Sequence, residues 1–228
     1  MGSSLVRGLL VTGMFSAFFL GSLYLERVLG YDAIQTGLAF MPLTLGIASL
    51  SLGGSAKLVE RFGTVPVLVA GLSLIIVALG LLANQGVGAS YFPGLLIPFL
   101  LLGLGAGASF LPLLTIGMSD APRQDAGLAS GIVNVSVQLF GAIGLATLGT
   151  IATDHSKSLA DQGESIRAAL TGGYHLAYVV AATAVAVGIL AALLVLRGPV
   201  EPTLQEAGGG ELELIETVEA GEPVAQAA

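Results

Sequence analysis

Long charge-free runs separated by short polar stretches dominate the pattern along this chain. A helix rises about 1.5 Å per residue, so about 20 apolar residues cross the hydrocarbon core of a bilayer. The pattern predicts an all-α integral membrane protein in which residues 1–198 form one six-span domain. We expect its transmembrane helices at about residues 8–25, 34–56, 65–83, 95–118, 127–152 and 174–196. Residues 199–228 are rich in Glu, Gly, Pro and Ala, and are expected to form a disordered acidic tail.

The polar stretches predict the turns of this bundle. No small-x-small cleavage site follows the first run, so we expect an uncleaved first span rather than a signal peptide. The longest loop is expected at residues 154–173, with a short surface helix at residues 165–170. The third span consists almost wholly of Leu, Val, Ile and Ala and is expected to face lipid.

The fifth span has one side made of small and polar residues. These residues recur at spacings of three and four or their sums: Gly127, Gly131, Asn134, Gln138, Gly141 and Gly149. An unpaired amide facing lipid would cost several kcal/mol, so this stripe must face protein or water. Two interpretations stay open, and they are compatible along one helix. The stripe either packs closely against a neighbouring helix or lines a polar translocation cavity.

Other spans carry further cavity candidates. Tyr24 continues a ridge of small residues in the first span, and Ser109 and Thr115 follow a glycine-rich segment in the fourth. That segment, GLGAG at residues 103–107, lacks the preceding strand and following acid of a nucleotide site, so it predicts a packing face. Glu26 ends the first span. It is either a boundary residue in headgroup water or a protonatable group at the outer mouth of a cavity.

Residues 119–152 resemble the loop and eleventh-type helix in the C-terminal half of major facilitator superfamily transporters. The matching segments are PRQDAGLASGIVN and QLFGAIGLATLGTIA, with departures at Val137 and Phe140. Residues 57–63, KLVERFG, resemble the loop motif of the superfamily through Glu60, Arg61 and Gly63. From the residues alone, this segment is a short cytoplasmic turn. Together these segments are similar to the fourteen-helix drug:proton antiporter branch.

The resemblance implies that the chain is one half of a major facilitator fold, built as a three-plus-three inverted repeat. It further implies multidrug or small-molecule efflux, coupled to protons when the chain is paired with an N-terminal half that carries the antiporter signature. The expected partners are the lipid bilayer, a small-molecule substrate and a separate N-terminal half, or a second copy in a homodimer. The alternative function is a non-transporting or decayed membrane subunit that only associates with another membrane protein.

Composition supports a membrane protein. The chain is 54% hydrophobic and 10% charged, whereas an ordinary soluble domain carries roughly 25% charged residues. The net charge of −7 is concentrated after Gly198, and scattered single Lys and Arg residues argue against a nucleic-acid partner. The chain has no Cys, and its spans contain no catalytic triad, metal-spaced cluster or phosphate loop. We therefore expect neither an enzyme nor a cofactor or metal.

The basic residues predict the orientation of the six spans. Five lie on the side of the termini, and three lie on the opposite side: Arg27, Lys157 and Arg167. Because cytoplasmic loops carry the excess of Lys and Arg, both termini are expected in the cytoplasm of a cell-membrane protein.

Overall fold

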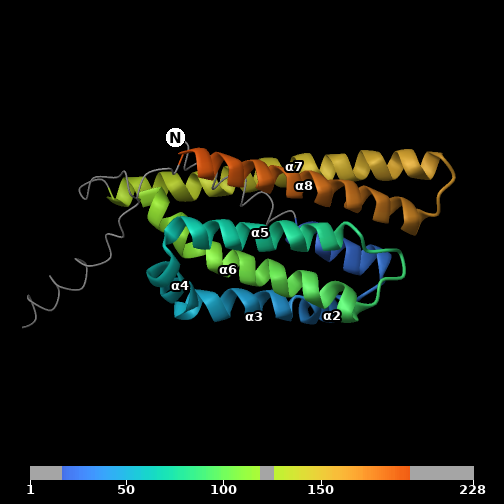
Figure 1. The fold of residues 1–228 in the computed structure, drawn as a ribbon. Helices are drawn as coiled ribbons and strands as arrows, with labels where there is room; N and C mark the ends of the chain where they lie inside the picture. The colour runs from blue at the N-terminus through green and yellow to red at the C-terminus, as the bar shows by residue number, and fades with distance from the viewer. Residues whose placement is uncertain (1–16, 119–125, 196–228) are drawn as a thin grey trace, which may run out of the picture. The chain divides into compact units, whose positions relative to one another are not determined.

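The computed structural model of the chain describes residues 17–118 and 126–195. All of the elements in these two ranges are helical, and Figure 1 shows their arrangement. Residues 17–23 are helical and continue into a short π-helix, η1. After residues 17–23, the elements in chain order are η1 (Tyr24–Val28), α2 (Ala33–Ala39), α3 (Met41–Ser49), η2 (Leu50–Gly54), α4 (Ser55–Phe62), α5 (Thr64–Leu82), η3 (Tyr91–Leu95), α6 (Leu96–Met118), α7 (Ala126–Asp161) and α8 (Ile166–Val195).

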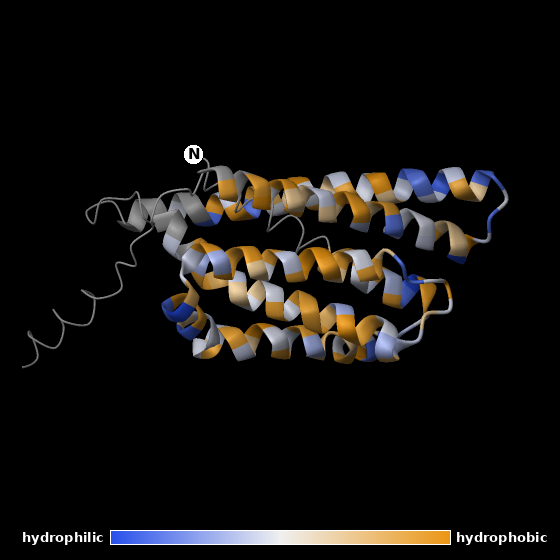
Figure 2. Ribbon diagram, viewed as in Figure 1, coloured by the Kyte–Doolittle hydropathy of each residue, from blue (hydrophilic) through white to orange (hydrophobic). Residues whose placement is uncertain are grey.

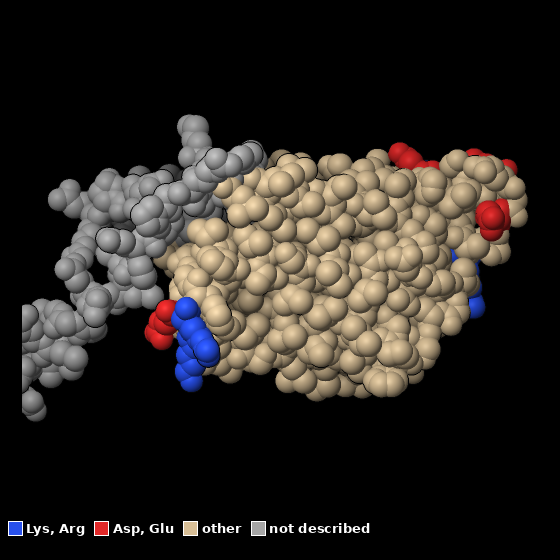
Figure 3. Space-filling model, in the orientation of Figure 1, with Lys and Arg blue, Asp and Glu red and all other residues tan. Residues whose placement is uncertain are grey.

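Five helices in the described part of the chain are long and apolar enough to cross a membrane. They are Ala33–Phe62, Thr64–Leu82, Tyr91–Leu113, Asn134–Asp161 and Ile166–Leu190. The charged side chains visible in Figure 3 gather at the two ends of the bundle, and apolar residues colour the middle of the helices in Figure 2. Half of the first predicted span, residues 8–16, lies outside the described residues, so the count of six stays a prediction.

Proline and glycine explain where the second membrane helix changes direction. Pro42 lies in the first turn of α3, where its missing N–H removes no helical hydrogen bond. Gly53 has a φ of 114°, a conformation that suits glycine, and the chain bends there before α4 begins. Gly63, with a φ of 87°, is the single residue between α4 and α5. The segment that was expected to be a turn is therefore mostly the helix α4, and that expectation was wrong.

Helix α6 lies between α3 and α5 because its glycines face both neighbours. A Cβ added at Gly107 would lie 2.9 Å from the carbonyl oxygen of Ile47 in α3. A Cβ added at Gly105 would lie 2.6 Å from the carbonyl oxygen of Gly71 in α5. Small residues of this kind allow helix backbones to approach closely in membranes. The predicted packing role of the GLGAG segment is confirmed.

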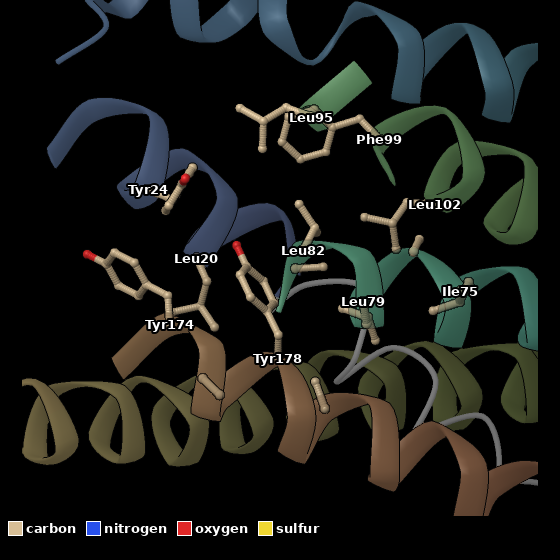
Figure 4. Close-up of a cluster of buried hydrophobic side chains, with 14 of the residues drawn as sticks. Leu20, Tyr24, Ile75, Leu79, Leu82, Leu95, Phe99, Leu102, Tyr174 and Tyr178 are labelled. Carbon is tan, nitrogen blue, oxygen red and sulfur yellow. The ribbon is translucent and has the colours of Figure 1, made fainter. Parts of the chain in front are cut away.

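Side chains from the first helix, α5, α6 and α8 form the main core (Figure 4). The α5 side chains Leu68, Leu72 and Leu79 are fully buried. The third span was expected to face lipid, and this was wrong, because one side of α5 packs against α6 while α8 covers another part of it. A uniformly apolar sequence does not indicate which of its sides meets protein.

The connection between α7 and α8 is much shorter than the sequence suggested. Helix α7 continues to Asp161 and α8 begins at Ile166, so the expected loop at residues 154–173 was wrong. Both helices continue beyond their apolar residues, and the additional helical turns are polar. The two helices pack tightly where Gly173 meets α7, since a Cβ there would overlap the hydroxyl of Ser156. Ser156 itself is buried and donates to the Ala152 carbonyl oxygen at 2.8 Å.

Candidate functional site

Two of the described membrane helices are much less buried than the others, and one of them is α7, which carries the small and polar stripe. Within the most apolar stretch of 18 residues in each span, only 17% of the residues are buried in Ala33–Phe62 and 22% in Asn134–Asp161. The corresponding share is 56% for Tyr91–Leu113 and 44% for Thr64–Leu82. The most apolar helix is thus well buried, whereas the helix with the most polar stripe is largely exposed.

The stripe on α7 is open at its polar positions. Asn134 and Gln138 are both exposed, and a Cβ added at Gly131 would meet nothing within 4 Å. Farther along the same side, Gly141 is buried. Close packing against another helix in the described part of the chain therefore does not account for the amides of Asn134 and Gln138. Residue 127, at the start of the stripe, lies in a segment whose side chains are outside the described part.

The other cavity candidates are committed to contacts within the bundle. Tyr24 is buried, and its hydroxyl donates to the Gly86 carbonyl oxygen at 2.6 Å in the loop between α5 and η3. Ser109 is also buried, and its hydroxyl donates to the Gly105 carbonyl oxygen at 2.8 Å beside the close contact between α5 and α6. Thr115 is half-buried and donates to the Leu111 carbonyl oxygen at 3.0 Å. The structure does not bring these three residues together with Asn134 and Gln138.

The residues of the loop motif lie on α4 and at its end. Glu60 and Arg61 are exposed, whereas Val59 is buried in a small cluster with Val67 of α5 and Ala108 of α6. Ser55 fixes the start of α4 because its hydroxyl donates to the Ala108 carbonyl oxygen at 3.1 Å. The motif therefore lies on an amphipathic helix held against the end of the bundle.

Charged and titratable groups near the opposite end hold local structure. Glu26 is exposed and accepts a hydrogen bond from the Ser22 hydroxyl at 3.1 Å. Asp32 caps α2, since its carboxylate accepts from the backbone N–H of Gln35 at 2.7 Å. The ring of His175 donates to the Gln85 carbonyl oxygen, so α8 helps to fix the same loop that Tyr24 holds. In the described ranges no group of three or more His, Cys, Asp or Glu residues could hold a metal ion.

A groove of about 780 Å³ lies between the first helix, α7 and the start of α8. This volume is in the usual range of small-molecule sites, roughly 300 to 1,000 Å³. Phe19, Leu23 and Leu145 line it together with Arg27 and Lys157. Sequence reasoning missed the groove because three separated segments form it. The available signal was the pair of hydroxyl residues that continues the α7 stripe, namely Thr153 and Ser156.

Comparison with known proteins matches most of the chain to one family and to export proteins. The family model of the Major Facilitator Superfamily matches residues 2–145. A puromycin resistance protein of Streptomyces alboniger is 35% identical over 196 residues, which are 85% of this chain and 39% of that protein. A cephamycin export protein of Amycolatopsis lactamdurans is 33% identical over 134 residues, which are 59% of this chain and 27% of that protein.

A tetracenomycin C resistance and export protein of Streptomyces glaucescens is 29% identical over 147 residues. These residues are 63% of this chain and 26% of that protein. The chain therefore spans well under half the length of each of these relatives.

Proposed function

Because the chain belongs to the Major Facilitator Superfamily of membrane transporters, we propose that it is the C-terminal half of a drug exporter. The names of its relatives describe resistance to or export of antibiotics, which supports a small organic molecule as the substrate. The segments at residues 119–152 that resemble the fourteen-helix branch support the assignment to the C-terminal half. In this proposal the six spans form a three-plus-three inverted repeat.

The exposed polar side of α7 is the observation that carries this proposal. A complete membrane protein turns its amide side chains toward protein or a water-filled cavity, because an unpaired amide in hydrocarbon is costly. Asn134 and Gln138 are instead exposed on one of the least covered helices of this chain. A second bundle facing α7 would give them partners or enclose them in a cavity. We favour a separate N-terminal half as that bundle over a second copy of this chain.

In this proposal, proton coupling belongs to the N-terminal half. Coupling needs a group that gains and loses a proton near the substrate path, and residues inside membrane spans usually carry it. The described membrane helices have their charged residues at the ends of the bundle, including Glu26 at the end of the first helix. Glu26 is therefore assigned at most a role at the outer mouth.

The orientation in the cell membrane can be tested by labelling single cysteines, since the chain has no native Cys. Ser158 and Glu60 are exposed at opposite ends of the bundle. With both termini in the cytoplasm, we expect an impermeant thiol reagent added to intact cells to label Ser158→Cys and not Glu60→Cys. Labelling of Glu60→Cys alone from outside would show the opposite orientation, with both termini outside the cell. Permeabilised cells, in which both cysteines should react, are the control.

The role of the α7 stripe can be tested with the double variant Asn134→Leu, Gln138→Leu. The chain is expressed in drug-sensitive bacteria with a separate N-terminal half, taken from the part of the puromycin resistance protein that lies outside the match. We expect the pair to raise puromycin resistance and the double variant to lose it. Loss of interhelical hydrogen bonds should also weaken co-purification of the two halves, by about 0.6 kcal/mol per bond.

The matched control is the double variant Ser73→Leu, Thr183→Leu. These two residues are also exposed polar residues in membrane helices, but each hydroxyl donates to a carbonyl oxygen of its own helix. This control is expected to keep full resistance. Equal resistance in both double variants would mean that the α7 stripe has no part in transport. Co-purification of the two halves without resistance would favour a subunit that associates and does not transport.

A further inference from the structure

The groove between the first helix and α7 continues the polar stripe toward the α7–α8 connection. Counting along α7, Leu145 follows Gln138 by seven residues, and Gly149, Thr153 and Ser156 follow at steps of four, four and three. These steps keep the residues on one side of a helix. All four of these later residues line the groove. The groove is therefore the far end of the side that carries Asn134 and Gln138.

The walls of the groove are apolar in one part and rich in hydroxyls in another. Phe19, Leu20 and Leu23 of the first helix and Leu145 and Ala146 of α7 form its apolar part. The hydroxyls of Thr150, Thr153 and Ser156 each donate to the carbonyl oxygen four residues earlier, at 2.8 Å. Since those protons are used within the helix, the hydroxyl oxygens offer lone pairs and can accept hydrogen bonds from a bound molecule.

The charges of the groove are unequal. Arg27 and Lys157 contribute two cations, and Asp154 contributes the one carboxylate among the lining residues. All three side chains are exposed, so water and solutes reach them. A cationic group would find a single carboxylate among two cations, whereas an anionic group would find two cations. Charge complementarity thus favours a negatively charged group on the occupant.

We propose that this groove binds small amphipathic molecules that carry a carboxylate, sulfonate or phosphate group. The apolar body lies against Phe19, Leu23 and Leu145, and the anionic group lies between Arg27 and Lys157. A donor on the same molecule, such as an ammonium group, is placed near Asp154 and the hydroxyl oxygens. The inference rests on the proposed export function for its meaning, because it assigns the groove to the substrate path and names the substrate class.

Three dansyl compounds test the proposal, since they share one fluorophore and differ in charge. Dansylglycine is an anion, dansylamide is neutral and dansylcadaverine is a cation. Binding is measured by fluorescence titration of the full chain in nanodiscs of neutral lipid, with empty nanodiscs subtracted. We expect saturable binding with dansylglycine tightest. Arg27→Gln and Lys157→Gln should each weaken the affinity for dansylglycine by about threefold, as expected for exposed charge pairs, and leave the affinity for dansylamide unchanged.

Two matched pairs of variants separate the groove from the rest of the surface. Arg167→Gln removes an exposed cation that lies at the same end of the bundle but does not line the groove. This variant should leave the affinity for all three compounds unchanged. Gly149→Leu adds a side chain at a position that lines the groove, where a Cβ meets nothing within 4 Å. This variant should abolish saturable binding. Gly80→Leu on α5 also has open space and does not line the groove, so it should bind normally.

The proposal is overturned if the three compounds bind equally, if no compound binds saturably, or if Gly149→Leu binds as well as the unmodified chain. The proposal is also overturned if Arg167→Gln weakens the binding of dansylglycine as much as Arg27→Gln and Lys157→Gln do, because the preference for the anion would then reflect general surface charge. The titration needs no partner half. A negative titration would therefore reject the groove without deciding whether the chain is the C-terminal half of an exporter, which the resistance assay tests. A negative resistance assay would likewise not decide whether the groove binds anions.

Discussion

Replacing Gly103 by Leu is expected to remove the stable folded state of the chain in detergent. A Cβ added at Gly103 would overlap the carbonyl group of Leu43 in α3. The same contact is close when seen from α3, because a Cβ added at Gly46 would lie 2.9 Å from the backbone carbonyl carbon of Gly103. The contact joins two backbones and not the ends of flexible side chains, so a larger residue must push the helices apart.

The size of this effect follows from the position of α6. Overpacking inside a protein core typically costs about 1 to 3 kcal/mol when side chains can adjust. At Gly103 the opposing atoms belong to a helix backbone, so we expect a cost above this range. Separation of α3 from α6 would also disturb the contact between α6 and α5 at Gly105.

Size-exclusion chromatography of a fluorescent fusion after heating measures the result. Gly103→Leu should give an aggregated or strongly destabilised protein. Gly80→Leu is the matched control, because it also lies within a membrane helix and a Cβ there meets nothing within 4 Å. If both variants melt at the same temperature as the unmodified chain, the close approach of α3 and α6 does not stabilise this bundle.

The sequence predicted where most helices lie, because charge-free runs report the length of chain that can enter a membrane. For the third span, the predicted residues 65–83 differ from α5 (Thr64–Leu82) by one residue at each end. The same signal failed at residues 154–173, where α7 and α8 continue as polar helices. Charged residues such as Asp154 and Lys157 end an apolar run, but they do not end a helix.

The sequence also predicted which residues allow close packing, but not which helices they bring together. The spacing of Gly103, Gly105 and Gly107 indicated a packing face, and the structure divides these glycines between α3 and α5. Burial of Tyr24 and Ser109 depends on contacts with distant segments, namely the loop at Gly86 and the helix at Gly71. One-dimensional periodicity shows the side of a helix on which a residue lies and does not show what faces it.

The second large effect concerns transport by the chain alone, which we expect to be absent. Proton-coupled export requires a protonatable group within the membrane path, and the charged residues of the described helices lie at their ends. Alternating access in this kind of transporter also requires one bundle to move against another. If the chain is one half of a transporter, as we propose, the second bundle and the coupling group must come from its partner, and the exposed Asn134 and Gln138 on α7 mark the side that the partner would cover.

Drug-driven proton movement in liposomes tests this central claim most directly. The purified chain is reconstituted with a pH-sensitive dye inside the vesicles, and antibiotics are added outside under a proton gradient. The chain alone should give the same slow signal as empty vesicles, and reconstitution with a matching N-terminal half should produce saturable, drug-dependent proton movement. Robust, saturable exchange by the chain alone would contradict the account, because the coupling group would then lie within this half.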